Sequence, residues 1–223
     1  MRLLWLPSVL RAAGLDVETT PGWELRGKDG PLAPMSPQVV VCHHTAVRAA
    51  TPDSAVANLL IKGRPDLPGP LAHLGLTRSG RYVVIASGVA NHAGLGGWAG
   101  FTGNRRAIGI EAYNSGLGEP WPTAQLDAYD RGSAAILKHL SLPAARLCGH
   151  KEWAPNRKID PQGIDMLQMR NRVAALMIVE EFVNQLTADE IAFLKAFIAG
   201  VLAVNSNADF AKTLIEDFRA RNP

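Results

Sequence analysis

Runs of apolar residues divide the chain into short strands and amphipathic helices. The unbroken, β-branched run at 39–44 is typical of a strand that is buried on both faces. Further strands are predicted at 71–77, 81–86, 107–113 and 145–148. Helices are predicted at 5–13, 51–62, 123–140 and 165–186. Strands and helices mixed in this order favour an α/β or α+β domain around one sheet, ending near residue 180.

Two threonines mark predicted helix starts. Thr51 is placed as an N-cap with Pro52 at the first helical position, and Thr123 is placed as the N-cap of the helix that follows it. The second helix is strongly amphipathic, because its apolar residues recur on one face from Leu126 to Leu140. We expect this face to cover the sheet.

Residues 187–223 follow a different pattern. A capping box at 187–190 precedes apolar residues at 3-4-3 spacing, and a second short helix has one apolar stripe. Two short helices cannot bury such stripes alone, because isolated helices of this length are marginal in water. We therefore predict a helical C-terminal extension that mediates homo-oligomer formation, with packing back on the same chain as the alternative.

Composition narrows the class of protein. With 47% hydrophobic and 19% charged residues, the chain is globular. No apolar stretch approaches the roughly 20 residues that span a bilayer, so we expect no transmembrane segment. The net charge of +3 suits an anionic polymer such as cell wall but is too small to indicate nucleic acid. The apolar stretch near the start lacks a cleavage site, so no export signal is expected.

Histidines at strand ends and in polar loops are the candidate metal ligands. His43 and His44 point to opposite faces of their strand, so only one of them can face a given site. His150 follows a strand, and Asp160 lies ten residues later across one loop. Two imidazoles with one carboxylate suit catalytic zinc, which keeps a fourth position open.

Four segments occur in an order that resembles a known enzyme family. They are Val40-Val41-Cys42-His43-His44-Thr45-Ala46, Asn91-His92-Ala93-Gly94, Ile108-Gly109-Ile110-Glu111, and Gly149-His150 followed by Asn156-Arg157-Lys158-Ile159-Asp160-Pro161. The chain resembles the type-2 N-acetylmuramoyl-L-alanine amidases, which are related to peptidoglycan recognition proteins. The resemblance covers roughly residues 38–170, and overall it is to an amidase endolysin of an actinobacterial phage.

The resemblance implies a fold and a set of site residues. The fold is a mixed central β-sheet flanked by helices, with a zinc amidase domain over residues 1–180 and the helical extension at 187–223. His43, His150 and Asp160 match the family's Zn²⁺ ligands. Lys158 matches the lysine that stabilises the oxyanion, and Glu111 matches the catalytic carboxylate of the bacterial branch.

Other interpretations of these residues stay open. Glu111 would also fit a solvated strand position, and Lys158 an exposed loop. Another branch has a tyrosine before a strand histidine, but Ala72 stands there in this chain, which shifts the general-base role to Glu111. Cys148 shares strand parity with His150 and is an alternative ligand, although its apolar surroundings favour a buried thiol.

Further residues near the motifs are candidates for substrate binding. Asn91 and His92 are expected to line a groove, and Trp98 and Trp153 could stack on sugar or peptide or could instead plug the core. The resemblance implies hydrolysis of the bond between N-acetylmuramic acid and L-alanine in peptidoglycan. The protein is expected in the host cytoplasm, acting on the wall after release. The alternatives are a non-catalytic wall-binding module and a cytoplasmic amidase for soluble anhydro-muropeptides.

Overall fold

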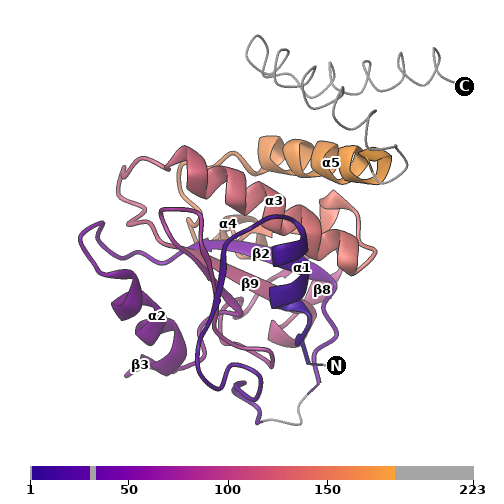
Figure 1. Ribbon diagram of the computed structural model, residues 1–223. Helices are drawn as coiled ribbons and strands as arrows, with labels where there is room; N and C mark the ends of the chain where they lie inside the picture. The colour runs from indigo at the N-terminus through magenta and orange to yellow at the C-terminus, as the bar shows by residue number, and fades with distance from the viewer. Residues whose placement is uncertain (1, 31–33, 184–223) are drawn as a thin grey trace, which may run out of the picture.

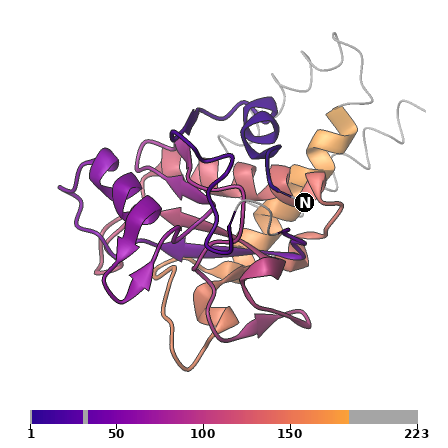
Figure 2. The same cartoon turned by 90° about the horizontal axis from the view of Figure 1, so that it is seen from below.

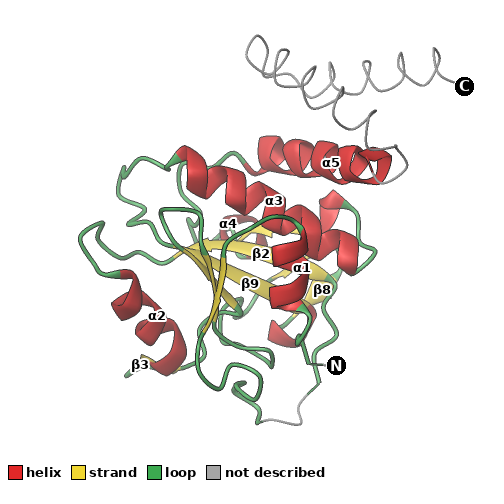
Figure 3. Ribbon diagram, in the orientation of Figure 1, coloured by secondary structure: helices red, strands yellow, loops and turns green. Residues whose placement is uncertain are grey.

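A six-stranded mixed sheet forms the centre of the protein (Figures 1 and 3). The computed structural model describes residues 2–30 and 34–183. The strand order is β1-β6-β5-β9-β2-β10, and β1 and β6 run antiparallel to the other four strands. The strands are β1 (Val17–Thr19), β2 (Val39–His44), β5 (Leu74–Leu76), β6 (Tyr82–Val84), β9 (Ala107–Ala112) and β10 (Leu147–Gly149). This is the predicted α/β fold with a mixed sheet.

Helices cover both faces of the sheet. They are α1 (Leu6–Ala12), α2 (Asp53–Lys62), α3 (Thr123–His139), α4 (His150–Trp153) and α5 (Met166–Val183). Helices α1 and α5 both pack against α3, and their apolar residues share one core with the sheet. Helix α2 packs in a second cluster on the other face, and the view from below shows α2 and α5 at opposite ends of the molecule (Figure 2).

Short elements connect these layers. Two small hairpins are formed by β3 (Gly63–Arg64) with β4 (Leu67–Pro68), and by β7 (Gly97–Trp98) with β8 (Phe101–Thr102). Two 3₁₀ helices, η1 (Asn104–Arg106) and η2 (Ala144–Arg146), lead directly into β9 and β10. Each therefore introduces one of the two strands that flank β2.

Strand β2 is buried along its whole length because both of its faces are covered. Val40 and Cys42 belong to the core beneath α3, whereas Val39 and Val41 pack with Trp153 on the other face. This burial explains why the sequence of β2 is continuously apolar rather than alternating. Successive side chains of a strand point to opposite faces, so His43 points to the same face as Val39 and Val41, opposite α3.

Most predicted elements are confirmed, and the corrections lie at helix starts and in loops. Neither Thr51 nor Thr123 is an N-cap, because the extended Pro52 and Pro122 occupy those positions and no side chain caps either helix. Strand β1 and helix α4 were not predicted, since each is too short to show a period in the sequence.

The C-terminal extension predicted at 187–223 lies outside the described residues, and so does the self-association assigned to it. Helix α5 reaches the end of the described range. Within that range, none of the helices combines the length and apolar character needed to cross a bilayer.

Candidate metal centre

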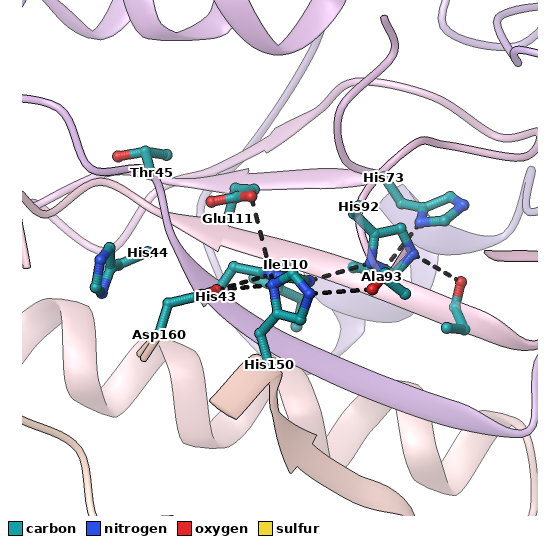
Figure 4. A network of polar contacts seen from close by, with 12 residues as sticks. His43, His44, Thr45, His73, His92, Ala93, Ile110, Glu111, His150 and Asp160 are labelled. Carbon is teal, nitrogen blue, oxygen red and sulfur yellow. Dashed lines mark hydrogen bonds and ion pairs between the residues drawn. The ribbon is translucent and has the colours of Figure 1, made fainter. Parts of the chain in front are cut away.

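The candidate site lies where three parallel strands end side by side. Strand β2 lies between β9 and β10, and all three run in the same direction. His43 lies near the end of β2, Glu111 is its register partner on β9, and His150 begins α4 directly after β10. The carboxyl ends of parallel strands form a crevice that side chains from several strands can line. The backbone therefore gathers these distant residues (Figure 4).

Three donor atoms converge at this edge of the sheet. His43 Nδ1 lies 2.9 Å from His150 Nδ1 and 3.0 Å from Asp160 Oδ2, and the last two atoms are 3.1 Å apart. All three residues are buried. They form the one cluster of His, Cys, Asp or Glu side chains in the described part of the chain that could hold a metal ion. The structure thus brings the predicted ligands together; their role as ligands stays a prediction.

The hydrogen bond made by Nε2 of His150 determines whether Nδ1 carries a proton or a lone pair. His150 Nε2 lies 3.0 Å from the carbonyl oxygen of Ala93, which can only accept a hydrogen bond. The proton of the neutral ring is therefore on Nε2, and Nδ1 presents a lone pair to the carboxylate of Asp160. Two acceptors that face each other at 3.1 Å repel unless a cation lies between them.

The electrostatic environment keeps His43 in the form a metal requires. Burial lowers the pKa of His43 to about 4, although Asp160 opposes this effect. A neutral imidazole is the metal-binding form of histidine. A tetrahedral zinc ion with bonds of about 2.0–2.1 Å needs donors roughly 3.3 Å apart, close to the observed spacing. The two imidazoles and the carboxylate therefore fit zinc.

Glu111 stands beside the donors without joining them. Its Oε1 lies 4.0 Å from His43 Nδ1, and its buried Oε2 has no hydrogen-bond partner among the described residues. Burial, followed by the negative charge of Asp160, raises the pKa of Glu111 well above its ordinary value, and the positive charge of Lys158 opposes the shift. A carboxyl group with a raised pKa and a free oxygen is suited to exchanging protons near neutral pH.

Lys158 brings positive charge to the same crevice. It is half-buried, and its ammonium group makes no hydrogen bond or ion pair with any described residue. Its charge nonetheless acts on His43, His44 and Glu111, lowering the pKa of each. An unpaired ammonium at this position is available to an anionic group on a substrate.

Two histidines predicted to be outside the ligand set take supporting positions. His44 points away from the cluster, and its Nδ1 accepts a hydrogen bond from the backbone of Gln162 at 3.0 Å. His92 was predicted to line a substrate groove, but it is buried behind His43. Its Nδ1 lies 3.1 Å from His43 Nε2, and its Nε2 lies 3.2 Å from Ala107 O. Both of its nitrogens are taken by protein groups.

The other predicted substrate-binding residues contact groups of the protein itself. Trp153 is 1% exposed and fills the core between β2 and the hairpin, so its position is structural. Trp98 donates a hydrogen bond to Ala145 O at 2.8 Å. Ala145 precedes β10, whereas His150 follows that strand. Asn91 is part-exposed and donates to Pro68 O at 2.9 Å. The burial of Trp153 favours the alternative in which it plugs the core, whereas substrate binding by Trp98 and Asn91 stays a prediction.

Sequence reasoning missed one residue that holds the site in place. Tyr129, which lies on the apolar face predicted for α3, accepts a hydrogen bond from the backbone N–H of His43 at 2.8 Å. Its hydroxyl oxygen also lies 3.0 Å from His43 O and 3.1 Å from Ile110 O. Helix α3 therefore contacts the backbones of β2 and β9, the two strands that carry His43 and Glu111, through this hydroxyl. Helical periodicity alone shows a buried ring and cannot show where its hydroxyl goes.

A mixed sheet with a buried His-His-Asp cluster and a free carboxylate at its strand ends is an arrangement that could hold a metal ion and serve a hydrolase. The family model of N-acetylmuramoyl-L-alanine amidase (Amidase_2) matches residues 33–163. Because this match spans more than half of the chain, the chain belongs to that family. Membership of this family supports N-acetylmuramoyl-L-alanine amidase activity.

Solved structures share the fold. The endolysin amidase LysCS from Clostridium intestinale URNW is 17% identical, with a TM-score of 0.53 over 71% of this chain and 95% of its own. The amidase AmiD from E. coli, solved with an anhydro-muropeptide substrate, is 24% identical, with a TM-score of 0.51 over 63% of this chain and 59% of its own. Drosophila PGRP-LB is 18% identical, with a TM-score of 0.50 over 69% of this chain and 91% of its own. No curated protein matched the chain.

Proposed function

We propose that this protein is a zinc-dependent N-acetylmuramoyl-L-alanine amidase that acts on peptidoglycan as a phage endolysin. The observation that carries the zinc assignment is the convergence of His43 Nδ1, His150 Nδ1 and Asp160 Oδ2 within 3.1 Å of one another. Family membership supports the amide substrate. The likeness in fold to an endolysin and the resemblance of the motifs to phage enzymes support the lytic role.

The reaction splits the amide between the lactyl group of N-acetylmuramic acid and L-alanine. Zinc, when bound by His43, His150 and Asp160, supplies a Lewis acid and lowers the pKa of water to about 7. Glu111 accepts the proton that water loses as its oxygen attacks the carbonyl carbon. When the carbon–nitrogen bond breaks, Glu111 returns this proton to the leaving L-alanine nitrogen. Its unpartnered Oε2 leaves one oxygen free for this exchange.

Lys158 stabilises the negative charge that builds up on the carbonyl oxygen during the attack. Its ammonium has no ion-pair partner among the described residues, so its charge is not neutralised before substrate binds. Preorganised charge of this kind costs no rearrangement during the reaction. Glu111 and Lys158 thus have complementary roles: Glu111 transfers a proton, and Lys158 stabilises negative charge without transferring one.

The proposed role also sets where the enzyme acts. As an endolysin, the protein is made in the host cytoplasm and reaches the wall after release. Its substrate is then the intact, cross-linked sacculus. An amidase for soluble anhydro-muropeptides uses the same bond chemistry, and AmiD has been solved with such a molecule. The two roles differ in the size of the substrate and share the reaction.

Metal analysis and a product assay test the proposal together. We expect one zinc ion per purified chain, loss of activity on chelation, and recovery when zinc is added. Release of free L-alanine amino groups is measured by mass spectrometry on intact sacculi and on soluble muropeptides. Activity confined to soluble fragments would replace the endolysin role with the cytoplasmic one. Zinc binding without any amide cleavage would contradict the enzymatic role and favour the non-catalytic wall-binding module.

A ligand variant and a surface variant make the metal test specific. His150→Ala removes a donor and is expected to abolish stoichiometric zinc and turnover. His139→Ala removes an exposed histidine whose ring lies against Trp5, 4.0 Å between ring centroids, and should leave both unchanged. If His150→Ala bound zinc stoichiometrically and cleaved normally, the ligand assignment would be wrong.

A further inference from the structure

His92 lies directly behind one of the proposed ligands, in a chain of polar contacts that leads away from the site. His43 Nε2 lies 3.1 Å from His92 Nδ1 (Figure 4). His92 Nε2 in turn lies 3.2 Å from the carbonyl oxygen of Ala107. The two rings are nearly perpendicular, at 90°, with centroids 5.2 Å apart. Neither ring stacks on the other, so the contact is made through nitrogen atoms.

The carbonyl at the end of this chain determines where each proton lies. Ala107 O has no hydrogen to donate, so His92 Nε2 must carry the proton of its neutral ring. His92 Nδ1 then has a lone pair and can only accept from His43 Nε2. The proton of His43 is thereby held on Nε2, and His43 Nδ1 presents its lone pair to His150 and Asp160.

The same loop fixes the second histidine. The carbonyl of Ala93, the residue after His92, faces His150 Nε2 at 3.0 Å. The side-chain oxygen of Asn104 accepts the backbone N–H of Ala93 at 2.9 Å and that of His92 at 3.3 Å, which holds the loop in place. One side chain and one carbonyl, adjacent in sequence, therefore orient both imidazoles.

Gly109 on strand β9 leaves room for the His92 ring because it has no side chain. A Cβ atom on Gly109 would lie 2.5 Å from both Cγ and Nδ1 of His92, closer than such contacts occur. The His92 ring therefore packs directly against backbone. Replacing this glycine would displace the atom that accepts from His43.

We propose that His92 is a positioning residue that holds His43 in the tautomer a metal ligand requires. It touches neither substrate nor metal and acts only through His43. The inference rests on the proposed zinc function for its consequence, but the location of the His92 proton is a property of the protein itself. Outer partners of this kind typically contribute about 10–100-fold to metal affinity.

Nitrogen NMR of histidine-labelled protein tests the tautomer directly, with and without zinc. We expect the His92 proton on Nε2 in both samples and a coupling between His43 Nε2 and His92 Nδ1 across their hydrogen bond in the zinc-loaded protein. A proton on His92 Nδ1 would overturn the proposal. This outcome differs from failure of the proposed function, in which the wild-type protein binds no zinc whatever tautomer His92 adopts.

Zinc affinity of matched variants tests the consequence. His92→Leu removes the acceptor and should weaken zinc binding by about 10–100-fold in a chelator competition. His92→Asn places an amide oxygen near the position of Nδ1 and should restore most of the affinity, which a purely structural role would not predict. Gly109→Ala should weaken binding like His92→Leu, and His139→Asn should bind like wild type. A folded His92→Leu protein with wild-type affinity would refute the idea, and if that variant does not fold, the tautomer measurement decides.

Discussion

At the residue scale, Glu111 combines burial, proximity and an unmet hydrogen-bonding need. It is paired in register with His43, and its Oε1 stands 4.0 Å from His43 Nδ1. A solvated strand glutamate, the alternative interpretation of the sequence, would have both oxygens in water, whereas Oε2 is buried without a partner among the described residues. Leaving a buried carboxylate oxygen unpaired costs stability, and its retention is typical of a functional position.

Replacing this carboxylate by an amide separates proton transfer from metal binding. We expect Glu111→Gln to fold and to bind zinc normally but to lose about 10²–10⁴-fold in turnover, the usual contribution of a general acid–base group. Product release and zinc content are measured on the same preparation. Glu18→Gln, at an exposed position of β1, is the control. Turnover near that of wild type in the Glu111 variant would exclude it from the mechanism.

At the element scale, α3 does more than cover the sheet. The Tyr129 hydroxyl on α3 accepts the N–H of His43 and contacts backbone oxygens on both β2 and β9. The Tyr113 hydroxyl, by contrast, is buried with no hydrogen-bond partner among the described residues. Two buried tyrosines therefore differ in whether the hydroxyl is satisfied, which offers a matched comparison.

Tyr129→Phe leaves the buried N–H of His43 without its acceptor. We expect it to lower the free energy of unfolding by about 1–3 kcal/mol, the cost of an unsatisfied buried donor. Tyr113→Phe removes a hydroxyl that has no hydrogen-bond partner among the described residues and should be neutral or slightly stabilising. Urea denaturation of both variants measures the difference. Equal losses in the two proteins would contradict the role assigned to the Tyr129 hydroxyl.

Helix α5 ties the last described part of the chain to the domain. Met169 and Val173 are buried in the main core. Arg170 pairs with Glu152 at 2.7 Å, and Arg172 pairs with Asp130 on α3 at 2.5 Å. Apolar burial and two part-buried ion pairs therefore join α5 to the core that lies beneath α3.

At the scale of the whole molecule, the sequence predicts that residues 187–223 mediate self-association. Light scattering should show an oligomer for the full chain and a monomer for a chain cut after Gln185. The cut chain should keep its fold and its zinc, because α5 retains its core contacts. A full-length monomer at micromolar concentration would contradict self-association and leave a helical cap on the same chain.

The sequence by itself determined the order of the longer strands and helices, the α/β class and, through motifs that resemble a known family, the residues that converge at the site. These depend on local properties: the burial of β2 appears as an unbroken apolar run, and the ligands occur in short motifs of fixed order. It could not place the tryptophans or His92. Spacing shows that a side chain lies in a loop near a motif, but not whether the loop turns it toward solvent or into the core.

Only the tertiary structure decided which atoms meet. The register of β2 against β9 sets His43 beside Glu111, and the end of β10 brings His150 to Asp160 across the loop. The role proposed for His92 depends on two contacts that cross between different segments of the chain. Local sequence determines which elements form because propensity and periodicity act over a few residues. Hydrogen bonds between distant groups determine the protonation of the site, because they depend on how those elements pack.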